Sequence, residues 1–395
     1  MEKLVSSWSS NQHLPEDYVF PVEQRPGEET TIPVCKAIPI IDLEKASHGR
    51  KDIIQQIIDA SQKFGFFQVI NHGVSGVLVH ETMSVVKEFF TMDDAEKASV
   101  YSDDHTKSCR LHTSSPNYDT EKSHFWRDYL RHPCHPVEDF IHLWPEKPAT
   151  YRNLSLRILD LISEGLGLEP GFFQGELSND LLMSTNYYPP CPDPSLSLGL
   201  PKHSDPNLIT LLLQEEIYGL QVYLDGQWLG VEPLSNAFVV NIGHQLQIVS
   251  NEKFRSVEHR AITNSREART TIASFISPCN SCIVEPAKAL VNEANPPLYR
   301  AFEYQEFLKS YVAKAGKKET ALQAYKIELS GKKPDFRVLK LNVDAAVRLG
   351  APSFLMDLTI RDNAGAFVIG KMVCKAMVTT VFEAETLAML EGVIK

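Results

Sequence analysis

His203 and Asp205 lie two residues apart, shortly before an apolar run at 208–213. Side chains on a strand alternate between its two faces, so residues at this spacing point to the same side. Two imidazoles and one carboxylate form a set that binds Fe(II) and leaves other metal positions open. The pair supplies two thirds of that set. Because ordinary composition gives about 0.6 His-x-Asp pairs by chance in such a chain, the surrounding sequence must decide whether the pair binds metal.

His259 is the residue that could complete the set. It lies 54 positions after Asp205 in the strand-like segment RSVEHRAI, far enough along the chain to occupy another strand. Ten residues later, Arg269 and Thr271 share a face by the same alternation. A guanidinium beside a hydroxyl binds a carboxylate in a fixed direction. Fe(II), Asp205 and Arg269 leave a positive charge that the two carboxylates of 2-oxoglutarate (2OG) would neutralise.

The composition favours a globular protein that acts on small molecules. The chain has 395 residues, 43% of them hydrophobic, which is enough for more than one core. Its formal net charge of −11 does not fit nucleic acid as the main partner, because proteins that bind phosphate backbones present basic surfaces. The sequence has neither an apolar run of membrane-spanning length nor a basic, apolar leader. We therefore expect a cytoplasmic monomer with a small-molecule substrate and no membrane partner.

Hydrophobic spacing divides the chain into five regions. Residues 1–100 combine an extended N-terminal arm, up to about 37, with strands and helices, and 101–180 read as loops followed by a long helix. From 181 to 330, short strands recur about every 8 to 12 residues before a C-terminal helix. This pattern is typical of an α+β fold with a double-stranded β-helix, or jelly-roll, core and helices on its outer face. A linker at 331–337 leads to a separate tail at 338–395.

Other residues of metal-binding type are predicted to be structural. His132 and His135 are each followed by a proline, which excludes the helix that would align them, so we expect a surface loop. Cys279 and Cys282 form a CxxC pair without a second pair at zinc-site spacing. We expect reduced thiols there.

Several motifs occur in the order found in one plant enzyme family: PIIDL, FGFFQVINHGV, NYYPPCP, HSD, NIG, EHRAITNSREARTTIASF and NPPLY. Over roughly residues 1–330 the chain resembles the plant 2OG and Fe(II)-dependent dioxygenases. Within that family it most resembles hyoscyamine 6-hydroxylase and the mugineic-acid dioxygenases, at LPEDYVFP, EKASVYS, WRDYLR and WPEKP. The resemblance implies that O2 is consumed, that 2OG is converted to succinate and CO2, that a substrate C–H bond is hydroxylated, and that ascorbate serves as reductant.

The resemblance also assigns roles to residues. It implies that the iron ligands are His203, Asp205 and His259, and that 2OG is bound by Arg269, Thr271, Tyr188 and Asn186. Two positions depart from the family pattern. Thr271 stands where Ser is more frequent, which keeps the hydroxyl, and His244 follows NIG where many members have Asp. We expect His244 at the surface or beside a ligand rather than on the metal.

Substrate contacts are harder to assign. Residues considered for the pocket and its lid are Trp126, Arg127, Tyr129, Phe275 and Tyr311, and core packing explains each of them equally well. The expected substrate is a small specialised metabolite, alkaloid-like or related. Epoxidation, desaturation and demethylation remain alternatives, because they share one oxidant and differ in how the substrate is placed. A relative that uses ascorbate without 2OG is a further alternative.

The tail at 338–395 resembles the first part of a ribonuclease H-like domain of the plant retroelement type, at KLNVDAA, IRDNAGAF and EAETLAMLEG. The resemblance places Asp344 and Glu385 where two metal-binding carboxylates belong. Two-metal nucleases need a cluster of acids, and the sequence ends before the strand that should bring the next Asp. We therefore expect a truncated α/β segment without nuclease activity. It still provides the rival function, a nucleic-acid-binding or nuclease module.

Overall fold

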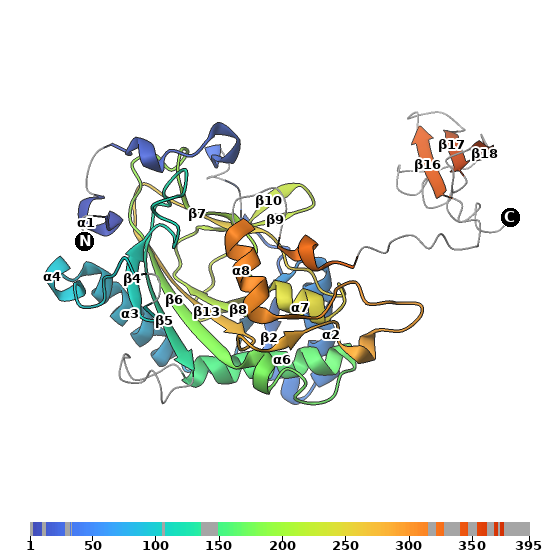
Figure 1. Ribbon diagram of the computed structural model, residues 1–395, viewed down its shortest axis with the longest axis horizontal. Helices are drawn as coiled ribbons and strands as arrows, with labels where there is room; N and C mark the ends of the chain where they lie inside the picture. The colour runs from blue at the N-terminus through green and yellow to red at the C-terminus, as the bar shows by residue number, and fades with distance from the viewer. Residues whose placement is uncertain are drawn as a thin grey trace. The chain divides into compact units, whose positions relative to one another are not determined.

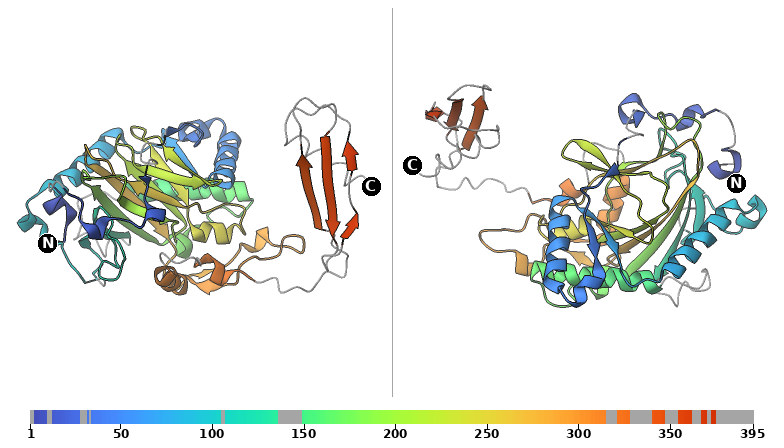
Figure 2. Two further views of the ribbon diagram at one scale, coloured as in Figure 1. Left: turned by 90° about the horizontal axis from the view of Figure 1, so that it is seen from above. Right: turned by 180° about the vertical axis from the view of Figure 1, so that it is seen from behind.

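The computed structural model describes residues 3–9, 13–27, 32, 34–104, 107–135, 149–314 and 321–327, together with four strands of the tail. Its internal contacts divide the chain into two compact units, Met1–Ile327 and Glu328–Lys395. The residues assigned above to iron, 2OG and substrate all belong to the first unit, whose elements are shown in Figures 1 and 2.

Two β-sheets form the framework of the first unit. The larger has the strand order β2-β3-β11-β8-β13-β6-β5-β4 and the smaller β1-β10-β9-β12-β7. The larger sheet consists of β2 (Ile40–Asp42), β3 (Phe66–Ile70), β11 (Phe238–Ile242), β8 (Ile209–Gln214), β13 (Arg269–Ser277), β6 (Asp180–Tyr188), β5 (Asp128–His135) and β4 (Arg110–Thr113). The smaller sheet consists of β1 (Val34–Cys35), β10 (Gln227–Val231), β9 (Leu220–Leu224), β12 (His259–Ile262) and β7 (Leu198–His203). Between β6 and β13 the chain passes repeatedly from one sheet to the other, which is consistent with the predicted jelly-roll core.

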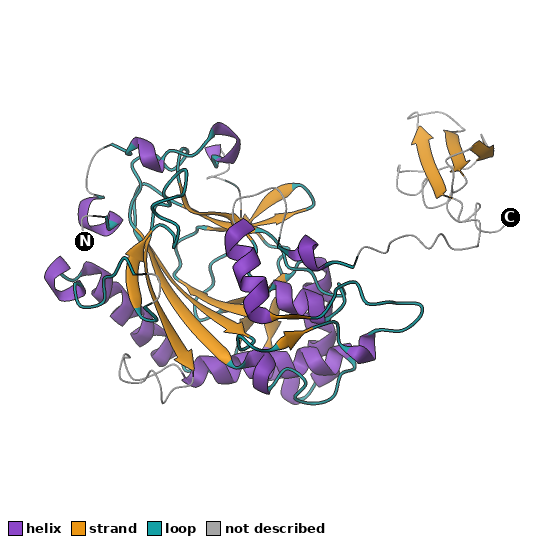
Figure 3. Ribbon diagram, viewed as in Figure 1, coloured by secondary structure: helices purple, strands orange, loops and turns teal. Residues whose placement is uncertain are grey.

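Three helices lie along the outer face of the larger sheet, α2 (Arg50–Lys63), α3 (Gly76–Thr91) and α6 (Ala149–Leu166) (Figures 1 and 3). Alternate apolar residues of the sheet, such as Leu211 and Ile272, pack in one core with Ile57 of α2 and Ile158 of α6. Burying each such side chain stabilises the fold by about 1.5–3 kcal/mol. Alternation directs the neighbouring residues to the opposite face, where Phe66 and Val239 form a second core with Val222 of the smaller sheet.

The remaining elements are short. The helices are α1 (Val5–Trp8), α4 (Asp94–Lys97), α7 (His244–Val249) and α8 (Tyr304–Lys314), and β14 (Ile283–Val284) pairs with β15 (Phe302–Glu303). Single 3-10 turns are η1 (Glu16–Tyr18), η2 (Val22–Gln24), η4 (Leu43–Ser47), η6 (Gly175–Ser178), η7 (Lys288–Leu290) and η8 (Leu322–Tyr325). In the described part of the chain, no helix is both long and apolar enough to span a membrane.

The inner face of the larger sheet carries polar side chains in register. Asn241 of β11 is the cross-strand partner of Thr210 on β8. Further along, Thr271 of β13 lies between Gln214 of β8 and Asn186 of β6. These polar side chains stand on the face opposite the helices, beside the apolar residues that pack against the smaller sheet.

The prediction of an extended N-terminal arm was wrong. α1 and η1 fold back so that Trp8 and Tyr18 meet Trp126 edge-on, with ring centroids 5.5 and 5.3 Å apart. Val5 and Tyr18 are buried with Trp126. The arm was misread because its few apolar residues lie far apart in sequence and find their partners only in the folded unit.

The prediction of loops between 102 and 147 was also wrong, because β4 and β5 lie there, β4 as the edge strand of the larger sheet and β5 next to it. Pro133 lies inside β5, and its inner face carries Arg131 instead of an apolar residue. Both features hide the apolar alternation that signals a strand. His132 is accordingly buried on β5 rather than exposed in a loop.

The tail unit contains β16 (Lys340–Ala346), β17 (Phe354–Arg361), β18 (Phe367–Ile369) and β19 (Met372–Cys374). β16, β18 and β19 all pair antiparallel with β17. Asp344 lies on β16 as the cross-strand partner of Asp357. Glu385 lies outside the described residues, so the ribonuclease H-like assignment stays a prediction.

Candidate metal centre and cosubstrate site

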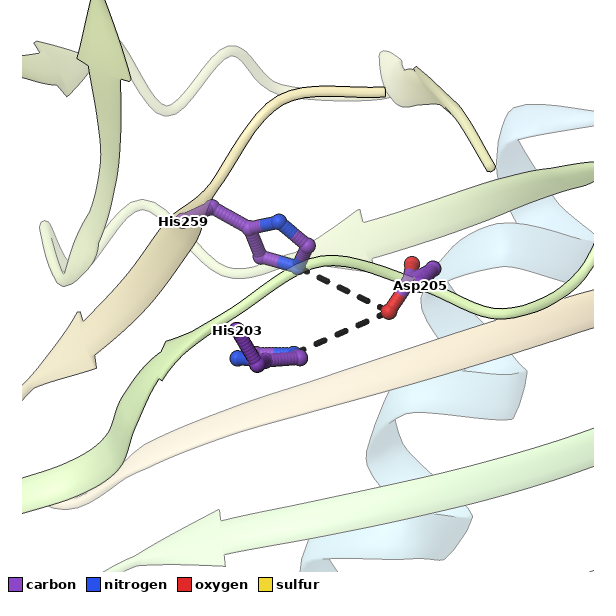
Figure 4. Close-up of side chains that lie close together, drawn as sticks. All are labelled: His203, Asp205 and His259. Atoms are coloured by element: carbon purple, nitrogen blue, oxygen red, sulfur yellow. Dashed lines mark ion pairs between the residues drawn. The ribbon is translucent and has the colours of Figure 1, made fainter. Parts of the chain in front are cut away.

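His203, Asp205 and His259 come together at one end of the smaller sheet (Figure 4). β7 ends at His203, β12 begins at His259, and the two residues are cross-strand partners. The loop after β7 places Oδ1 of Asp205 3.7 Å from Nε2 of His203 and 3.8 Å from Nε2 of His259. One ligand atom from each residue lies within 4.8 Å of the others. Among the described residues this is the one such group of three His, Cys, Asp or Glu.

Backbone carbonyls orient both imidazoles. Nδ1 of His203 donates to the carbonyl of Pro201 at 2.9 Å, and Nδ1 of His259 to that of Val257 at 3.2 Å. Because a carbonyl can only accept, each Nδ1 carries the proton and each Nε2 keeps its lone pair. Burial, followed by the nearby His259, lowers the pKa of His203 to about 3. His203 is therefore neutral, which is the form that binds a metal.

Asp205 is held by side chains from β8 and β11. Its Oδ2 accepts hydrogen bonds from Oγ1 of Thr210 at 2.5 Å and from Nδ2 of Asn241 at 2.7 Å. Burial by itself raises the pKa of Asp205, but the two His and these two hydrogen bonds outweigh it and hold the pKa below its usual range. The carboxylate is ionised, and its Oδ1 faces the two imidazoles.

The NIG motif fixes the loop that carries Asp205. The amide of Gly243 donates to the carbonyl of Leu208 at 2.7 Å, and the amide of His244 donates to that of Asp205 at 2.8 Å. A Cβ on Gly243 would overlap the carbonyl oxygen of Asn207, so a glycine is required for this close approach. The side chain of Asn241 in this motif thus donates to the carboxylate of Asp205, and the backbone amides of Gly243 and His244 hold the loop that carries it.

Asn241→Ala is expected to weaken Fe(II) binding by about 10- to 100-fold, as is typical when a hydrogen bond to a metal ligand is lost. The variant leaves Oδ2 of Asp205 with one of its two side-chain donors. Anoxic calorimetric titration with Fe(II) measures the change. Asn153→Ala, at an exposed position of α6, is the matched control. Equal affinities in the two variants would show that the orientation of Asp205 has no part in metal binding.

His244 was expected either at the surface or beside a metal ligand. It is buried, which excludes the surface position. Its Nε2 lies 2.8 Å from Oγ of Ser204, the residue between His203 and Asp205. Its ring meets Tyr311 of α8 edge-on, and Oη of Tyr311 donates to the carbonyl of Ser204 at 2.8 Å. Burial lowers the pKa of His244 to about 4, which keeps it neutral. His244 thus joins the metal-binding loop to α8.

The four residues assigned to 2OG form two cross-strand pairs. Arg269 on β13 faces Tyr188 on β6, and Thr271 faces Asn186. All four are buried. Nδ2 of Asn186 donates to Oγ1 of Thr271 at 3.3 Å, so the hydroxyl proton of Thr271 is free to donate to a carboxylate.

Arg269 lacks a protein counter-charge among the described residues. Its Nε donates to the carbonyl of Ile217 at 3.1 Å and its Nη2 to Oε1 of Gln214 at 2.9 Å. Burial lowers the pKa of Arg269, as expected for a cation removed from water. Nε2 of Gln214 is also buried without a hydrogen-bond partner. One incoming carboxylate would neutralise the guanidinium and accept from the amide.

Two glycines make space at this site. A Cβ on Gly219 would lie 2.7 Å from Cδ of Arg269, and a Cβ on Gly199 would overlap the ring of Tyr188. Gly199 lies on β7 of the smaller sheet, whereas Tyr188 lies on β6 of the larger one. The two sheets therefore approach each other closely beside the cosubstrate residues.

Two of the residues considered for substrate contacts lie in packed surroundings. Trp126 is fully buried in the N-terminal aromatic cluster, and its Nε1 donates to the carbonyl of Pro189 at 3.0 Å. Tyr129 is buried, and its hydroxyl accepts from Nη2 of Arg110 at 2.9 Å. Core packing explains the position of Trp126, while Tyr129 anchors a guanidinium.

The other three lie closer to the site. Nη1 of Arg127 donates to Oδ1 of Asn186 at 3.0 Å. Phe275 is half-buried and is the cross-strand partner of Thr210, which holds Asp205. Tyr311 touches the metal-binding loop from α8. These positions suit a substrate pocket and its lid.

Sequence reasoning missed Thr210, Asn241 and Gln214. A signal was present, because Thr210 and Gln214 are the polar residues of the otherwise apolar segment LITLLLQ and stand on one face of the strand. The motif NIG was noticed, but its Asn could be assigned to Asp205 only once β11 and β8 were known to be neighbours.

Comparison with known proteins identifies the family. The model of the 2OG-Fe(II) oxygenase superfamily matches residues 179–278, and that of the N-terminal region of non-haem dioxygenase in morphine synthesis matches 38–147. Hyoscyamine 6-dioxygenase of Hyoscyamus niger is 41% identical over 351 residues, which cover 83% of this chain and 100% of that protein. The chain belongs to the 2OG-Fe(II) oxygenase superfamily. It is a 2OG-dependent dioxygenase whose cofactors are Fe(II) and 2OG.

Further members of this superfamily are similar over the same extent. 2'-Deoxymugineic-acid 2'-dioxygenase of Hordeum vulgare is 40% identical over 333 residues, covering 80% of this chain and 95% of that protein. The crystal structure of JOX2 in complex with 2OG, Fe and JA matches with a TM-score of 0.70 at 33% identity, covering 82% of this chain and 97% of that one. The predicted family is confirmed. Neither family model extends into the tail unit.

Proposed function

We propose that this oxygenase hydroxylates a small specialised metabolite, alkaloid-like or related, and that His203, Asp205 and His259 hold its Fe(II). The observation that carries the proposal is the convergence of three ligand atoms within 4.8 Å, near a buried Arg269 that no described carboxylate neutralises. Relatives named as dioxygenases at 41% and 40% identity support it. The donor set, two neutral imidazoles and one carboxylate, fits Fe(II).

Bound Fe(II) and 2OG together supply the oxidant for C–H hydroxylation, with succinate and CO2 as coproducts. The part of the protein is to place both reactants. Arg269 and Thr271 would bind the far carboxylate of 2OG from one face of β13. Asn186 orients the Thr271 hydroxyl. Tyr188 packs against the guanidinium, whose carbon lies 5.4 Å from the ring centroid.

α8 covers the metal-binding loop and limits the access of water. Tyr311 donates to the carbonyl of Ser204, and His244 contacts both Phe307 and Tyr311 of this helix. Excluding water keeps a reactive oxidant for the substrate. Which bond reacts depends on how the substrate is placed, so epoxidation, desaturation and demethylation are alternative outcomes for the same residues.

The proposed function is tested by succinate release from the Fe(II)-loaded protein in the presence of ascorbate. The compounds tested are alkaloids, coumarins, flavonoids and amino-acid-derived chelators. We expect one of these classes to increase succinate formation, with the amount of succinate proportional to the amount of hydroxylated product. A product that gains one oxygen atom and carries a new hydroxyl group in its NMR spectrum establishes hydroxylation, whereas the same mass gain with loss of a C=C bond would assign epoxidation. A product that loses two hydrogens instead would assign desaturation. Turnover without any keto acid would contradict the proposal.

The nucleic-acid alternative has no support beyond the motifs of the tail. Asp344 and Asp357 stand on neighbouring strands of the tail unit, and Glu385 lies outside the described residues. The proposal therefore assigns the activity to the first unit.

A further inference from the structure

Three guanidinium groups gather at β4 and β5 on the inner face of the larger sheet. Arg110 and Arg131 are cross-strand partners. Arg127 precedes β5 and, by alternation, shares the face of Tyr129 and Arg131. Tyr129 is the cross-strand partner of Asn186, which belongs to the cosubstrate set. The three arginines thus continue the inner face away from the 2OG residues.

Two of these arginines have structural partners. Nη2 of Arg110 donates to the hydroxyl of Tyr129 at 2.9 Å. Nε of Arg127 donates to the carbonyl of Ser114 at 2.9 Å, and its guanidinium lies over the ring of Tyr129 with the carbon 5.0 Å from the centroid. Together with the bond to Asn186, these contacts account for both side chains without a ligand.

Arg131 is different, because its guanidinium forms no hydrogen bond or ion pair within the described part of the chain. Its side chain is exposed to solvent. Surrounding protein nevertheless lowers the pKa of Arg131 by burial, and Arg110 and Arg127 add to the lowering as like charges. The guanidinium is therefore open to solvent and stands beside two like charges, those of Arg110 and Arg127.

No ion pair joins Arg131 to a carboxylate among the described residues. The inner-facing positions of β4, β5, β8 and β13 contain neither Asp nor Glu, while on β6 this face carries Asp180, four residues before Ser184, the cross-strand partner of Arg131. In the filled site Fe(II), Asp205, Arg269 and 2OG balance one another. Arg131 is therefore a positive charge that the cosubstrate does not need.

Arg131 stands on the same face of the larger sheet as a residue that holds Asp205. Its cross-strand partner on β6 is Ser184, which pairs with Ala273 of β13, and Ala273 pairs with Leu212 of β8. Thr210, two residues before Leu212 and on the same face, donates to Oδ2 of Asp205. A small molecule in contact with Arg131 could therefore extend along this face towards the metal.

We propose that the substrate carries a carboxylate, that Arg131 binds this carboxylate, and that the bond to be oxidised then lies at the metal centre. The inference rests on the proposed function and narrows its substrate class. A charge-assisted, bidentate bond fits both the fork of the guanidinium and its lack of a partner among the described residues. Cationic alkaloids would meet three positive groups on this face, so among small specialised metabolites the inference favours carboxylic acids.

The carboxylate of 2OG is a less suitable occupant of Arg131. Arg269 offers it a buried guanidinium together with the Thr271 hydroxyl and the unpartnered amide of Gln214. Arg131 offers one guanidinium in a solvent-accessible place. Arg269 is therefore assigned to the carboxylate of 2OG and Arg131 to the carboxylate of the substrate.

The test uses the full chain loaded with Fe(II) and 2OG and a panel of aromatic and alicyclic carboxylic acids. Each acid is paired with its primary amide and the corresponding amine, beginning with cinnamate, cinnamamide and cinnamylamine. Binding is read under anoxic conditions from the visible charge-transfer band of the Fe(II)·2OG complex, and turnover from stimulated succinate formation. We expect acids to act at concentrations about 10- to 100-fold lower than their amides, which corresponds to one hydrogen-bonded charge pair.

Variants assign the preference to Arg131. Arg131→Ala should remove the acid-over-amide preference, Arg131→Lys should restore part of it, and the exposed control Arg255→Ala should leave it unchanged. The KM for 2OG should be unaffected in all three. The inference would be overturned if amides or amines acted at the same concentrations as the acids, or if no acid of the panel acted. It would also be overturned if the preference for acids survived in Arg131→Ala. A raised KM for 2OG in Arg131→Ala would also overturn it, by assigning this arginine to the cosubstrate.

Failure of this inference is distinguishable from failure of the proposed function. If the Fe(II)·2OG band forms normally but no acid is preferred, the assignment of Arg131 alone is wrong. If 2OG binding does not depend on Fe(II), the proposed function itself is wrong.

Discussion

Asp205→Ala and His203→Ala are each expected to abolish Fe(II)-dependent succinate formation. Each substitution leaves two of the three ligand atoms that now lie within 4.8 Å of one another. Succinate is measured by mass spectrometry after incubation with Fe(II), 2OG, ascorbate and O2, and bound iron is measured on the same samples. Activity and retained iron should fall together.

His48→Ala is the control, because this His is exposed and distant in sequence from the site. Folding is monitored separately by thermal denaturation, since removing the Asp205 carboxylate leaves the donors of Thr210 and Asn241 buried without their acceptor. An unsatisfied buried donor costs about 1–3 kcal/mol. Asp205→Asn keeps an acceptor at this position and separates the two effects. Full turnover in Asp205→Asn and His203→Ala would remove both residues from the metal set.

Arg269→Ala is expected to raise the KM for 2OG by about 10- to 100-fold, the loss that corresponds to one hydrogen-bonded charge pair. The side chain is buried and already gives one bond each to Ile217 and Gln214, so its remaining donors are directed by the protein. The turnover number at saturating 2OG should fall less than kcat/KM does. Initial rates of succinate formation over a range of 2OG concentrations provide both values.

Two further variants define what Arg269 contributes. Arg269→Lys keeps the charge but loses the planar fork, so we expect an intermediate KM. Arg266→Ala, at an exposed position three residues earlier, is the control. If the KM for 2OG were the same in Arg269→Ala and Arg266→Ala, the far carboxylate would have to bind elsewhere.

The candidate metal set could be found from the sequence because its signals are local. His203 and Asp205 lie two residues apart, and His259 lies in a second strand-like segment at sufficient separation. The expectation that Asp205 shares a strand with His203 was wrong, because β7 ends at His203 and the following loop places Asp205. The pairing of β7 with β12 then places the two His opposite each other. Arg269 and Thr271 were recognisable for the same reason, since both stand on one face of one strand.

Residues whose role depends on tertiary pairing could not be found in this way. Asn241 and Thr210 reach Asp205 only because β11 and β8 are neighbours. Arg131 was hidden because a charged residue two positions before a proline does not resemble a strand position. Trp126 illustrates the opposite error, since its aromatic ring suggested a ligand contact while Trp8 and Tyr18, more than a hundred residues earlier, pack against it.

The central claim is that His203, Asp205 and His259 hold the iron to which 2OG binds, with Arg269 as the second anchor. Anoxic titration of the protein with 2OG, followed through the visible charge-transfer band, tests this claim most directly. The band should develop only when Fe(II) is present, saturate at one 2OG per chain, disappear in Asp205→Ala and need more 2OG in Arg269→Ala. Binding of 2OG with unchanged affinity in the absence of Fe(II), or an unaltered band in Asp205→Ala, would contradict it.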